Sequence, residues 1–133
     1  MTDLGQTIRV LVVDDNVDTR DSLCFLLNRS GYAAVSARDG HQALEVHRRA
    51  PVDVLITDIY MPLSDGLETI QAFRRESPRV RIIAMSGGGQ VARGSYLAVA
   101  SSIGADATLQ KPFGFETLLD VFRSWRLAPP DAH

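Results

Sequence analysis

The sequence predicts an α/β fold, in which a mostly parallel five-stranded sheet carries helices on both faces. Apolar runs rich in β-branched residues alternate along the chain with segments whose apolar residues recur at helical spacing. The strand runs are apolar at consecutive positions, which is typical of parallel strands that are buried on both sides. A length of 133 residues accommodates one such domain with one core.

Five segments have the composition of buried strands. In chain order they are residues 8–13, 32–37, 52–57, 80–85 and 107–110. The first is broken only by Arg9, the third is uninterrupted, and the fourth ends at the glycines 87–89. These strands are expected to run in the same direction, because a helical segment separates each from the next.

Five further segments have the apolar spacing of helices that cover a sheet. In chain order they are residues 17–30, 39–49, 67–77, 96–103 and 118–125. Gly31 and Gly104 are expected to end the first and the fourth, since glycine readily adopts the conformation that follows a helix. Pro51 and Pro78 are expected to end the second and the third, because proline cannot continue a helix.

Composition and charge limit the partners and the compartment. The formal charge is -2, and the 14 Lys and Arg residues are spread along the chain without forming a block, so no nucleic-acid partner is expected. Cys24 is the only cysteine and lies in an apolar segment, so it is expected to be a buried structural thiol. Neither a signal peptide nor a run of about 20 apolar residues is present. We therefore expect no membrane insertion and a cytoplasmic location.

Polar side chains follow four of the predicted strands at the point where each strand ends. They are Asp14, Asp15, Asp58, Ser86 and Lys111. The carboxyl ends of parallel strands meet at one edge of the sheet, where ligands of such folds bind. Each residue alone is compatible with a structural role, since Asp14 or Asp15 can cap the first helix. Several carboxylates at one edge repel each other, however, and a hard divalent cation such as Mg²⁺ relieves that repulsion.

Four motifs in this order and at this spacing resemble the receiver domain of two-component response regulators, over residues 8–126. They are Val-Val-Asp-Asp at 12–15, Thr-Asp-Ile-Tyr-Met-Pro at 57–62, Met-Ser at 85–86 and Lys-Pro-Phe at 111–113. The resemblance implies a flavodoxin-like, doubly wound sheet with strand order 2-1-3-4-5. Residues 1–7 are then expected to be an N-terminal extension and 127–133 a C-terminal tail. Such a tail is too short for an output domain, so a stand-alone, single-domain receiver is expected.

The resemblance also implies how a phosphoryl group is accepted. Asp58 is the expected phosphoacceptor, and it takes the group from a phosphohistidine on a sensor histidine kinase or a histidine phosphotransfer protein. The implied cofactor is Mg²⁺, which Asp15, Asp58 and the backbone carbonyl of Tyr60 would bind directly. Asp14 would act on the metal largely through water. The domain would thus catalyse its own phosphorylation and slow dephosphorylation, without being an enzyme for another substrate.

Two more residues are implied to stabilise the phosphoryl group and to read it. Lys111 would pair with the phosphoryl oxygens, and the Lys111–Pro112 bond resembles the family's cis peptide. The hydroxyl of Ser86 would move to the new phosphoryl oxygen and draw the following loop with it. The signal would then pass to an unknown downstream protein or along a phosphorelay, from a monomer or from a phosphorylation-dependent dimer.

Two regions depart from the usual pattern of the family. Thr108 stands where many receivers have an aromatic residue that rotates inward on phosphorylation. The segment between Ser86 and Lys111 is about three residues longer than in compact members, which suggests that ordering of residues 87–96 carries the signal instead. Tyr60 and Gly88 are at positions that affect how fast water reaches the acyl phosphate, and shielding by Tyr60 predicts a long-lived phosphorylated state.

Two other functions are compatible with some of the same residues. A haloacid dehalogenase-type hydrolase would need Asp-x-Asp after the first strand, whereas Asp14 and Asp15 are adjacent. A phosphorylation-independent interaction module remains the alternative, although every residue needed for phosphorylation is present. The histidines at 41, 47 and 133 lack the context of a phosphorylated histidine and are expected to be solvated or partly packed.

Overall fold

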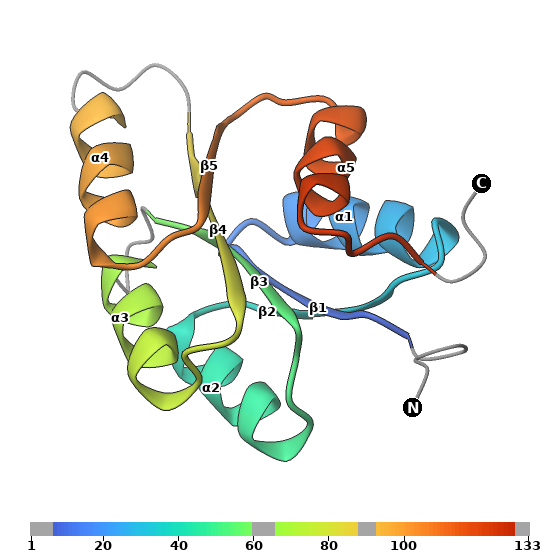
Figure 1. Cartoon of the computed structure of the whole chain (residues 1–133), viewed down its shortest axis with the longest axis horizontal. Coiled ribbons are helices and arrows are strands. Elements are labelled where there is room, and N and C mark those ends of the chain that lie inside the picture. The colour runs from blue at the N-terminus through green and yellow to red at the C-terminus, as the bar shows by residue number, and fades with distance from the viewer. Residues whose placement is uncertain (1–6, 60–65, 88–92, 130–133) are drawn as a thin grey trace.

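The computed structural model describes residues 7–59, 66–87 and 93–129. Strands and helices alternate through all of them (Figure 1). The strands are β1 (Arg9–Val13), β2 (Ala33–Ala37), β3 (Val54–Asp58), β4 (Arg81–Ser86) and β5 (Ala107–Gln110). The helices are α1 (Val17–Arg29), α2 (Gly40–Arg49), α3 (Gly66–Glu76), α4 (Arg93–Ile103) and α5 (Phe115–Ser124).

The sheet has the predicted topology. Its order is β2-β1-β3-β4-β5, and every neighbouring pair is parallel. The winding direction reverses between β1 and β3, because β2 lies on one side of β1 and the later strands lie on the other. The carboxyl ends of β1 and β3 therefore form the switch point at which a doubly wound sheet binds its ligands.

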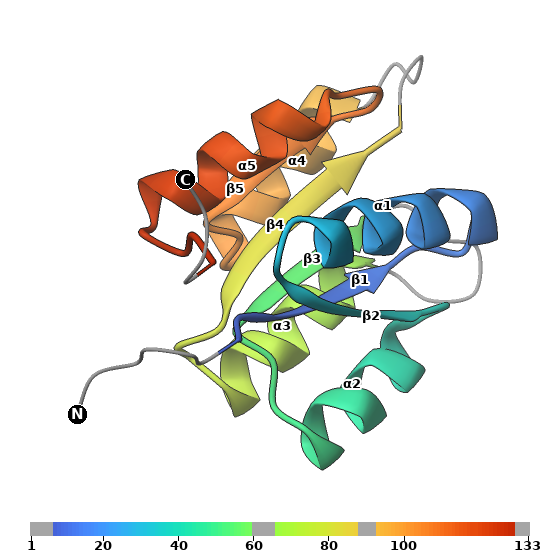
Figure 2. The ribbon, with the colours of Figure 1, turned by 90° about the vertical axis from the view of Figure 1, so that its right-hand side faces the viewer.

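Helices lie on both sides of the sheet (Figure 2), and an apolar layer fills the space between the sheet and the helices on each side. Leu11, Leu55 and Ile82 point to the layer that contains Phe73 of α3, together with residues of α2 and α4. The alternate strand positions point to a second layer, in which Leu27 of α1 packs with residues of α5. Both faces of the central strands are thus buried, which explains why their sequences are apolar at consecutive positions.

The ends of several elements differ from the prediction. β3 extends to Asp58, which pairs with Met85 in the sheet, so Asp58 is the last residue of the strand and does not follow it. α5 begins at Phe115, earlier than expected, because Gly114 is the N-cap. α4 begins at Arg93, also earlier than expected. Helix starts are set by local backbone geometry, whereas the apolar pattern marks only the buried turns.

The side chain that caps the N-terminus of α1 belongs to neither Asp14 nor Asp15. Asn16 is the N-cap, and its side chain accepts a hydrogen bond from the Thr19 N–H at 3.0 Å. Neither Asp14 nor Asp15 is therefore needed as the cap of this helix. Asp14 instead accepts the Asn16 N–H at 2.9 Å and turns the chain from the strand into the helix.

A side chain of α1 also bonds to the outer strand of the sheet. The Asn28 amide donates to the Ala34 carbonyl at 3.3 Å, and its oxygen accepts the Ala34 N–H at 2.8 Å. Ala34 lies in β2, which is at the edge of the sheet. These two hydrogen bonds fix the last turn of α1 against the strand that follows it.

His47 is buried, so the expectation of a solvated or partly packed ring was wrong for this residue. It is 6% exposed, and its ring lies against Phe73. Its Nδ1 accepts the Val52 N–H at 3.1 Å, which requires the ring proton to lie on Nε2, 2.7 Å from the Ser77 hydroxyl. Burial lowers the pKa of His47. The side chain thus joins the last turn of α2 to the residues just before β3 and just after α3.

Cys24 is less buried than the sequence predicted. Its side chain is half-buried at the margin of the layer beneath α1, and burial raises the pKa of its thiol to about 11. Within the described ranges, no helix combines the length and the apolar character that crossing a membrane requires.

Candidate functional site

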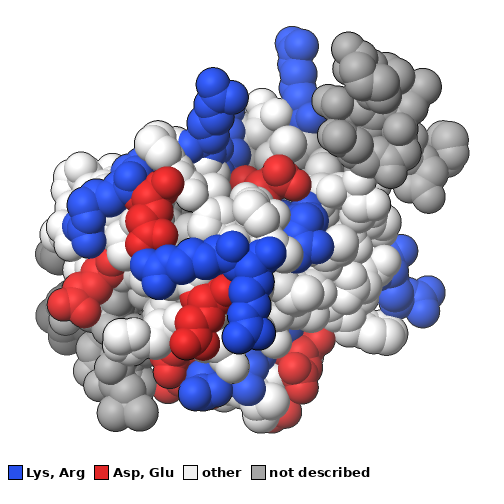
Figure 3. Space-filling model, turned by 90° about the horizontal axis from the view of Figure 1, so that it is seen from below, with Lys and Arg blue, Asp and Glu red and all other residues white. Residues whose placement is uncertain are grey.

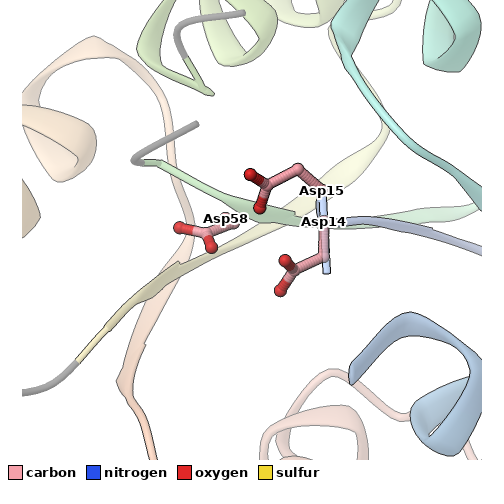
Figure 4. Close-up of side chains that lie close together, drawn as sticks. All are labelled: Asp14, Asp15 and Asp58. Carbon is pink, nitrogen blue, oxygen red and sulfur yellow. The ribbon is translucent and has the colours of Figure 1, made fainter. Parts of the chain in front are cut away.

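Three carboxylates meet at the switch point of the sheet (Figure 4). Asp14 and Asp15 directly follow β1, and Asp58 ends β3. Each offers an oxygen that lies within 4.8 Å of the oxygens of the other two. Asp14 is 1% exposed and Asp58 is 6% exposed, whereas Asp15 is open to solvent. The structure thus brings together the three acidic residues that the sequence placed at one edge.

Lys111 joins this cluster from the segment after β5. Its Nζ lies 2.7 Å from Asp14 Oδ2 and 3.0 Å from Asp58 Oδ2. Burial disfavours the ammonium, but hydrogen bonds and charge from the two carboxylates outweigh burial, so the pKa of Lys111 is raised. The ammonium is therefore the counter-ion of two buried carboxylates.

The backbone of Lys111 is fixed as well. Its N–H donates to the Ser86 carbonyl at 2.8 Å, which joins the ends of β4 and β5. The Lys111–Pro112 peptide bond is cis, as the family resemblance implied.

Asp14 is held more firmly than its neighbour in the sequence. Its Oδ1 accepts the Asn16 N–H at 2.9 Å, and its Oδ2 binds Lys111. Its backbone carbonyl accepts a hydrogen bond from Arg20 Nη1 at 3.1 Å, and its N–H donates to the Ala37 carbonyl at 3.2 Å. Both carboxylate oxygens are engaged, so Asp14 cannot turn without breaking a contact.

Gly66 places α3 directly beside Asp58. A Cβ atom on Gly66 would lie 2.1 Å from the Asp58 backbone oxygen and 2.4 Å from the Ile59 Cα. Only glycine can start the helix at this separation, because these contacts are to backbone atoms that cannot move aside. No role for Gly66, Asn16 or Arg20 was expected from the sequence. Two signals were available in the sequence. Gly66 lies at the start of one helical pattern, and Asn16 lies just before another.

Ser86 ends β4, one residue beyond the partner of Asp58 in the sheet. It is 4% exposed, and its hydroxyl donates to the Gly87 carbonyl at 3.4 Å. This hydrogen bond is long, so it holds the hydroxyl weakly. Thr108 is half-buried in β5, opposite Ala84. Tyr60 and Gly88 lie outside the described residues.

Comparisons with curated proteins identify relatives that share most of this chain. The response regulator MprA of Mycobacterium leprae is 36% identical over 127 residues, which cover 94% of this chain and 54% of that protein. MprA of Mycobacterium tuberculosis strain H37Rv is 35% identical over 128 residues, with 95% and 54% covered. The chain thus spans about half the length of the curated relatives it matches.

Solved structures and a family model agree with these relatives. Chemotaxis protein CheY4 of Vibrio cholerae has a TM-score of 0.80 and 31% identity, covering 89% of this chain and 98% of that one. The receiver domain of NtrX from Brucella abortus has a TM-score of 0.79 and 28% identity, covering 89% and 97%. The model of the response regulator receiver domain matches residues 10–123. The chain therefore belongs to the response regulator receiver domain family, whose members are phosphoacceptor domains of two-component signalling.

Proposed function

We propose that this domain accepts a phosphoryl group on a carboxylate oxygen of Asp58. The donor is a phosphohistidine on a sensor histidine kinase or a histidine phosphotransfer protein. The observation that carries the proposal is a buried carboxylate at the switch point, 3.0 Å from the Lys111 ammonium and beside two more carboxylates. An oxygen–phosphorus bond forms, the nitrogen–phosphorus bond of the donor breaks, and its electron pair returns to the imidazole.

We assign a Mg²⁺ site to the same cluster. Carboxylate oxygens are the ligands that this ion prefers, and three of them lie within 4.8 Å of one another. Asp15 is exposed and Asp58 carries the acceptor oxygen, so both suit direct ligands. Asp14 already accepts two hydrogen bonds, so it suits contact through water. The backbone carbonyl of Tyr60, outside the described residues, would be a further ligand. When bound, the ion neutralises charge on the oxygens of the transferred group.

Lys111 is suited to follow the charge as it moves during transfer. Its ammonium binds Asp58 and Asp14 together, so it stays anchored to Asp14 when an Asp58 oxygen becomes part of the acyl phosphate. The freed N–H groups then pair with phosphoryl oxygens. A cation that is already in place lowers the barrier, because it does not reorganise during the reaction.

Ser86 is the proposed switch residue. Its hydroxyl makes only a 3.4 Å hydrogen bond to Gly87, so a phosphoryl oxygen would be the stronger acceptor. Movement of the hydroxyl would draw the following segment toward the site. Ordering of residues 87–96, of which 88–92 lie outside the described part of the chain, would then carry the signal, since Thr108 offers no aromatic ring to rotate. Hydrogen exchange in that segment should slow on phosphorylation, and an unchanged rate would contradict this route.

We further propose that residues 8–126 act as a receiver unit in the cytoplasm, flanked by residues 1–7 and 127–133. The phosphorylated form would bind a target protein or pass the group on in a phosphorelay, as a monomer or a phosphorylation-dependent dimer. The competing function is a receiver fold that binds partners without phosphorylation. The intact set of Asp14, Asp15, Asp58, Ser86 and Lys111 favours the phosphorylated route.

The decisive experiment is intact mass spectrometry after incubation with acetyl phosphate, with and without Mg²⁺. The wild type should gain one phosphoryl group only when Mg²⁺ is present, and Asp58→Asn should gain none. Asp120→Asn is the matched control, because Asp120 is an exposed aspartate on α5. An adduct on Asp58→Asn would show that another residue is the acceptor. No adduct from acetyl phosphate or from a panel of phosphorylated kinases would favour the phosphorylation-independent module.

A further inference from the structure

Arginines gather at the edge of the sheet opposite the carboxylate cluster, and we propose that they form a docking surface for an acidic segment of a partner protein. The surface comprises the exposed residues Arg48, Arg49, Arg75, Arg79 and Arg81, and is called the basal arginine face below. They come from the ends of α2 and α3, the connection after α3 and the first residue of β4. Figure 3 shows basic side chains spread over the lower side of the molecule, with acidic ones between them.

The fold creates this surface from residues that are scattered in the sequence. In a parallel sheet with crossover helices, strand starts and helix ends lie at one edge, and strand ends lie at the other. The ion pair of Arg48 with Glu76 and the hydrogen bond of His47 with Ser77 hold the ends of α2 and α3 together. Because these arginines are spread along the sequence, only the folded structure shows that they lie together.

Positive charge exceeds negative charge at this edge. Among the residues that the structure describes, Arg9 and Arg74 lie there in addition to the basal arginine face, and three carboxylates accompany them, namely Asp53, Glu76 and Asp106. The whole chain has a formal charge of -2, so the remainder of the molecule is acidic. Such an uneven distribution produces a local field that attracts anions despite the net negative charge.

Structural roles account for only some of these arginines. Arg74 donates to the Val80 carbonyl at 2.9 Å and pairs with Asp106, and Arg48 pairs with Glu76. Basic residues in the last turn of a helix also stabilise its dipole. Arg49, Arg75 and Arg79, however, have no carboxylate within ion-pair distance among the described residues. Arg79 is not in a helix, and clustered like charges repel each other, so stability alone does not account for the group.

The chemistry of the surface favours a polypeptide over a nucleic acid. Guanidinium groups match carboxylates in a two-pronged geometry, and every cation of the surface is an arginine. The interspersed carboxylates would repel a continuous row of phosphates, whereas an acidic peptide can place its neutral residues opposite them. The acidic remainder of the molecule also opposes the approach of a long polyanion.

The location implies that this docking does not depend on phosphorylation. Asp58 is the last residue of β3, whereas the basal arginine face lies where strands begin, at the other end of the sheet. A partner bound there would leave the carboxylate cluster free for a kinase. The domain would then have a constitutive attachment at one edge and a switch at the other.

The test measures binding of fluorescein-labelled poly-L-glutamate to the full chain by fluorescence anisotropy. The surface variant is Arg49→Gln/Arg75→Gln/Arg79→Gln. The matched control is Arg29→Gln/Arg38→Gln/Arg123→Gln, which removes the same charge from exposed residues outside this surface, namely on α1, after β2 and on α5. We expect the surface variant to bind about tenfold more weakly and the control within about twofold of wild type. Binding should weaken as salt rises from about 0.05 M to about 0.3 M. Phosphorylation of the surface variant by acetyl phosphate should be unchanged, which verifies its fold.

Asp58→Asn separates this inference from the proposed phosphotransfer, because it should bind the acidic probe as wild type does. Absence of binding by the wild type at low salt would overturn the proposal, as would equal losses in the two triple variants. Tighter binding of duplex DNA or of anionic phosphatidylglycerol vesicles than of the peptide would also overturn it, in favour of that other partner. An affinity that changes on phosphorylation would refute the constitutive attachment.

Discussion

The ammonium of Lys111 lies 3.0 Å from the carboxylate of Asp58, although 53 residues separate them in the sequence. The same ammonium binds Asp14, so one cation joins the ends of β1 and β3 to the segment after β5.

Replacement of Lys111 by methionine should slow phosphorylation without moving its site. Methionine keeps much of the length of the side chain but removes the charge, so developing charge on the phosphoryl oxygens loses its partner. The expected loss in rate with acetyl phosphate is about 10²-fold, the effect of removing one such donor. Intact mass as a function of time measures it, with Arg38→Gln as the control for loss of one positive charge. A wild-type rate in Lys111→Met would exclude the role assigned to the ammonium.

Mg²⁺ should stabilise the folded domain through the carboxylate cluster. An ion that binds only the folded state at about ten times its dissociation constant raises the free energy of unfolding by about 1.4 kcal/mol. Urea denaturation with and without Mg²⁺ measures the difference. Asp15→Asn should lose most of it, whereas Asp120→Asn should keep it. Equal stabilisation of both variants would place the ion elsewhere.

Gly66→Ala should disturb the site through the backbone. The added Cβ would lie 2.1 Å from the Asp58 oxygen, so α3 must shift away from β3. We expect a loss of about 1–3 kcal/mol in the free energy of unfolding, the usual cost of overpacking. Gly87→Ala is the control, since a Cβ there would meet nothing within 4 Å. If both variants unfold at the same urea concentration as wild type, the close approach of α3 does not constrain the sequence.

His47 should make the domain less stable in mild acid. The folded state keeps the ring neutral and lowers its pKa below the ordinary value of 6.5. Between the lowered pKa and 6.5, the unfolded chain binds a proton that the folded chain does not. The contribution of His47 to the free energy of unfolding is therefore fully present above pH 6.5 and decreases as the pH falls through that window.

The decrease from His47 should reach at most about 1.4 kcal/mol per pH unit, the value for one proton. Urea denaturation at several pH values measures it. His47→Gln should be less stable at neutral pH and less sensitive to pH in the window, while His41→Gln, at an exposed position, should retain the wild-type sensitivity. If His47→Gln keeps the full pH dependence of the wild type, the loss of stability in acid arises from other groups.

Apolar patterning was sufficient to predict the strands and the edge at which the site lies. A strand buried on both faces is apolar at consecutive positions, and parallel direction then places Asp14, Asp58 and Lys111 at one edge without further information. The sheet order, which the family resemblance supplied, places the ends of β1 and β3 side by side.

Features that depend on tertiary packing could not be predicted in the same way. His47 resembles a solvated helix residue in the sequence, and only the approach of Phe73 and Ser77 buries it. Gly66 is critical because the end of β3 passes close to its Cα, and a glycine at the start of a helical pattern does not by itself indicate that contact. The basal arginine face likewise forms only when the ends of α2 and α3 lie side by side.

The two hydrogen bonds between Asn28 and Ala34 have a consequence beyond the fold of one chain. The outer strand of a sheet offers unpaired backbone groups to which a strand of another molecule can add, and this is a common start of aggregation. The carboxamide of Asn28 has the same donor and acceptor as a peptide bond, and it occupies both outward groups of Ala34. An incoming strand would first have to displace it, so the Asn28 side chain opposes edge-to-edge association through β2 at this position.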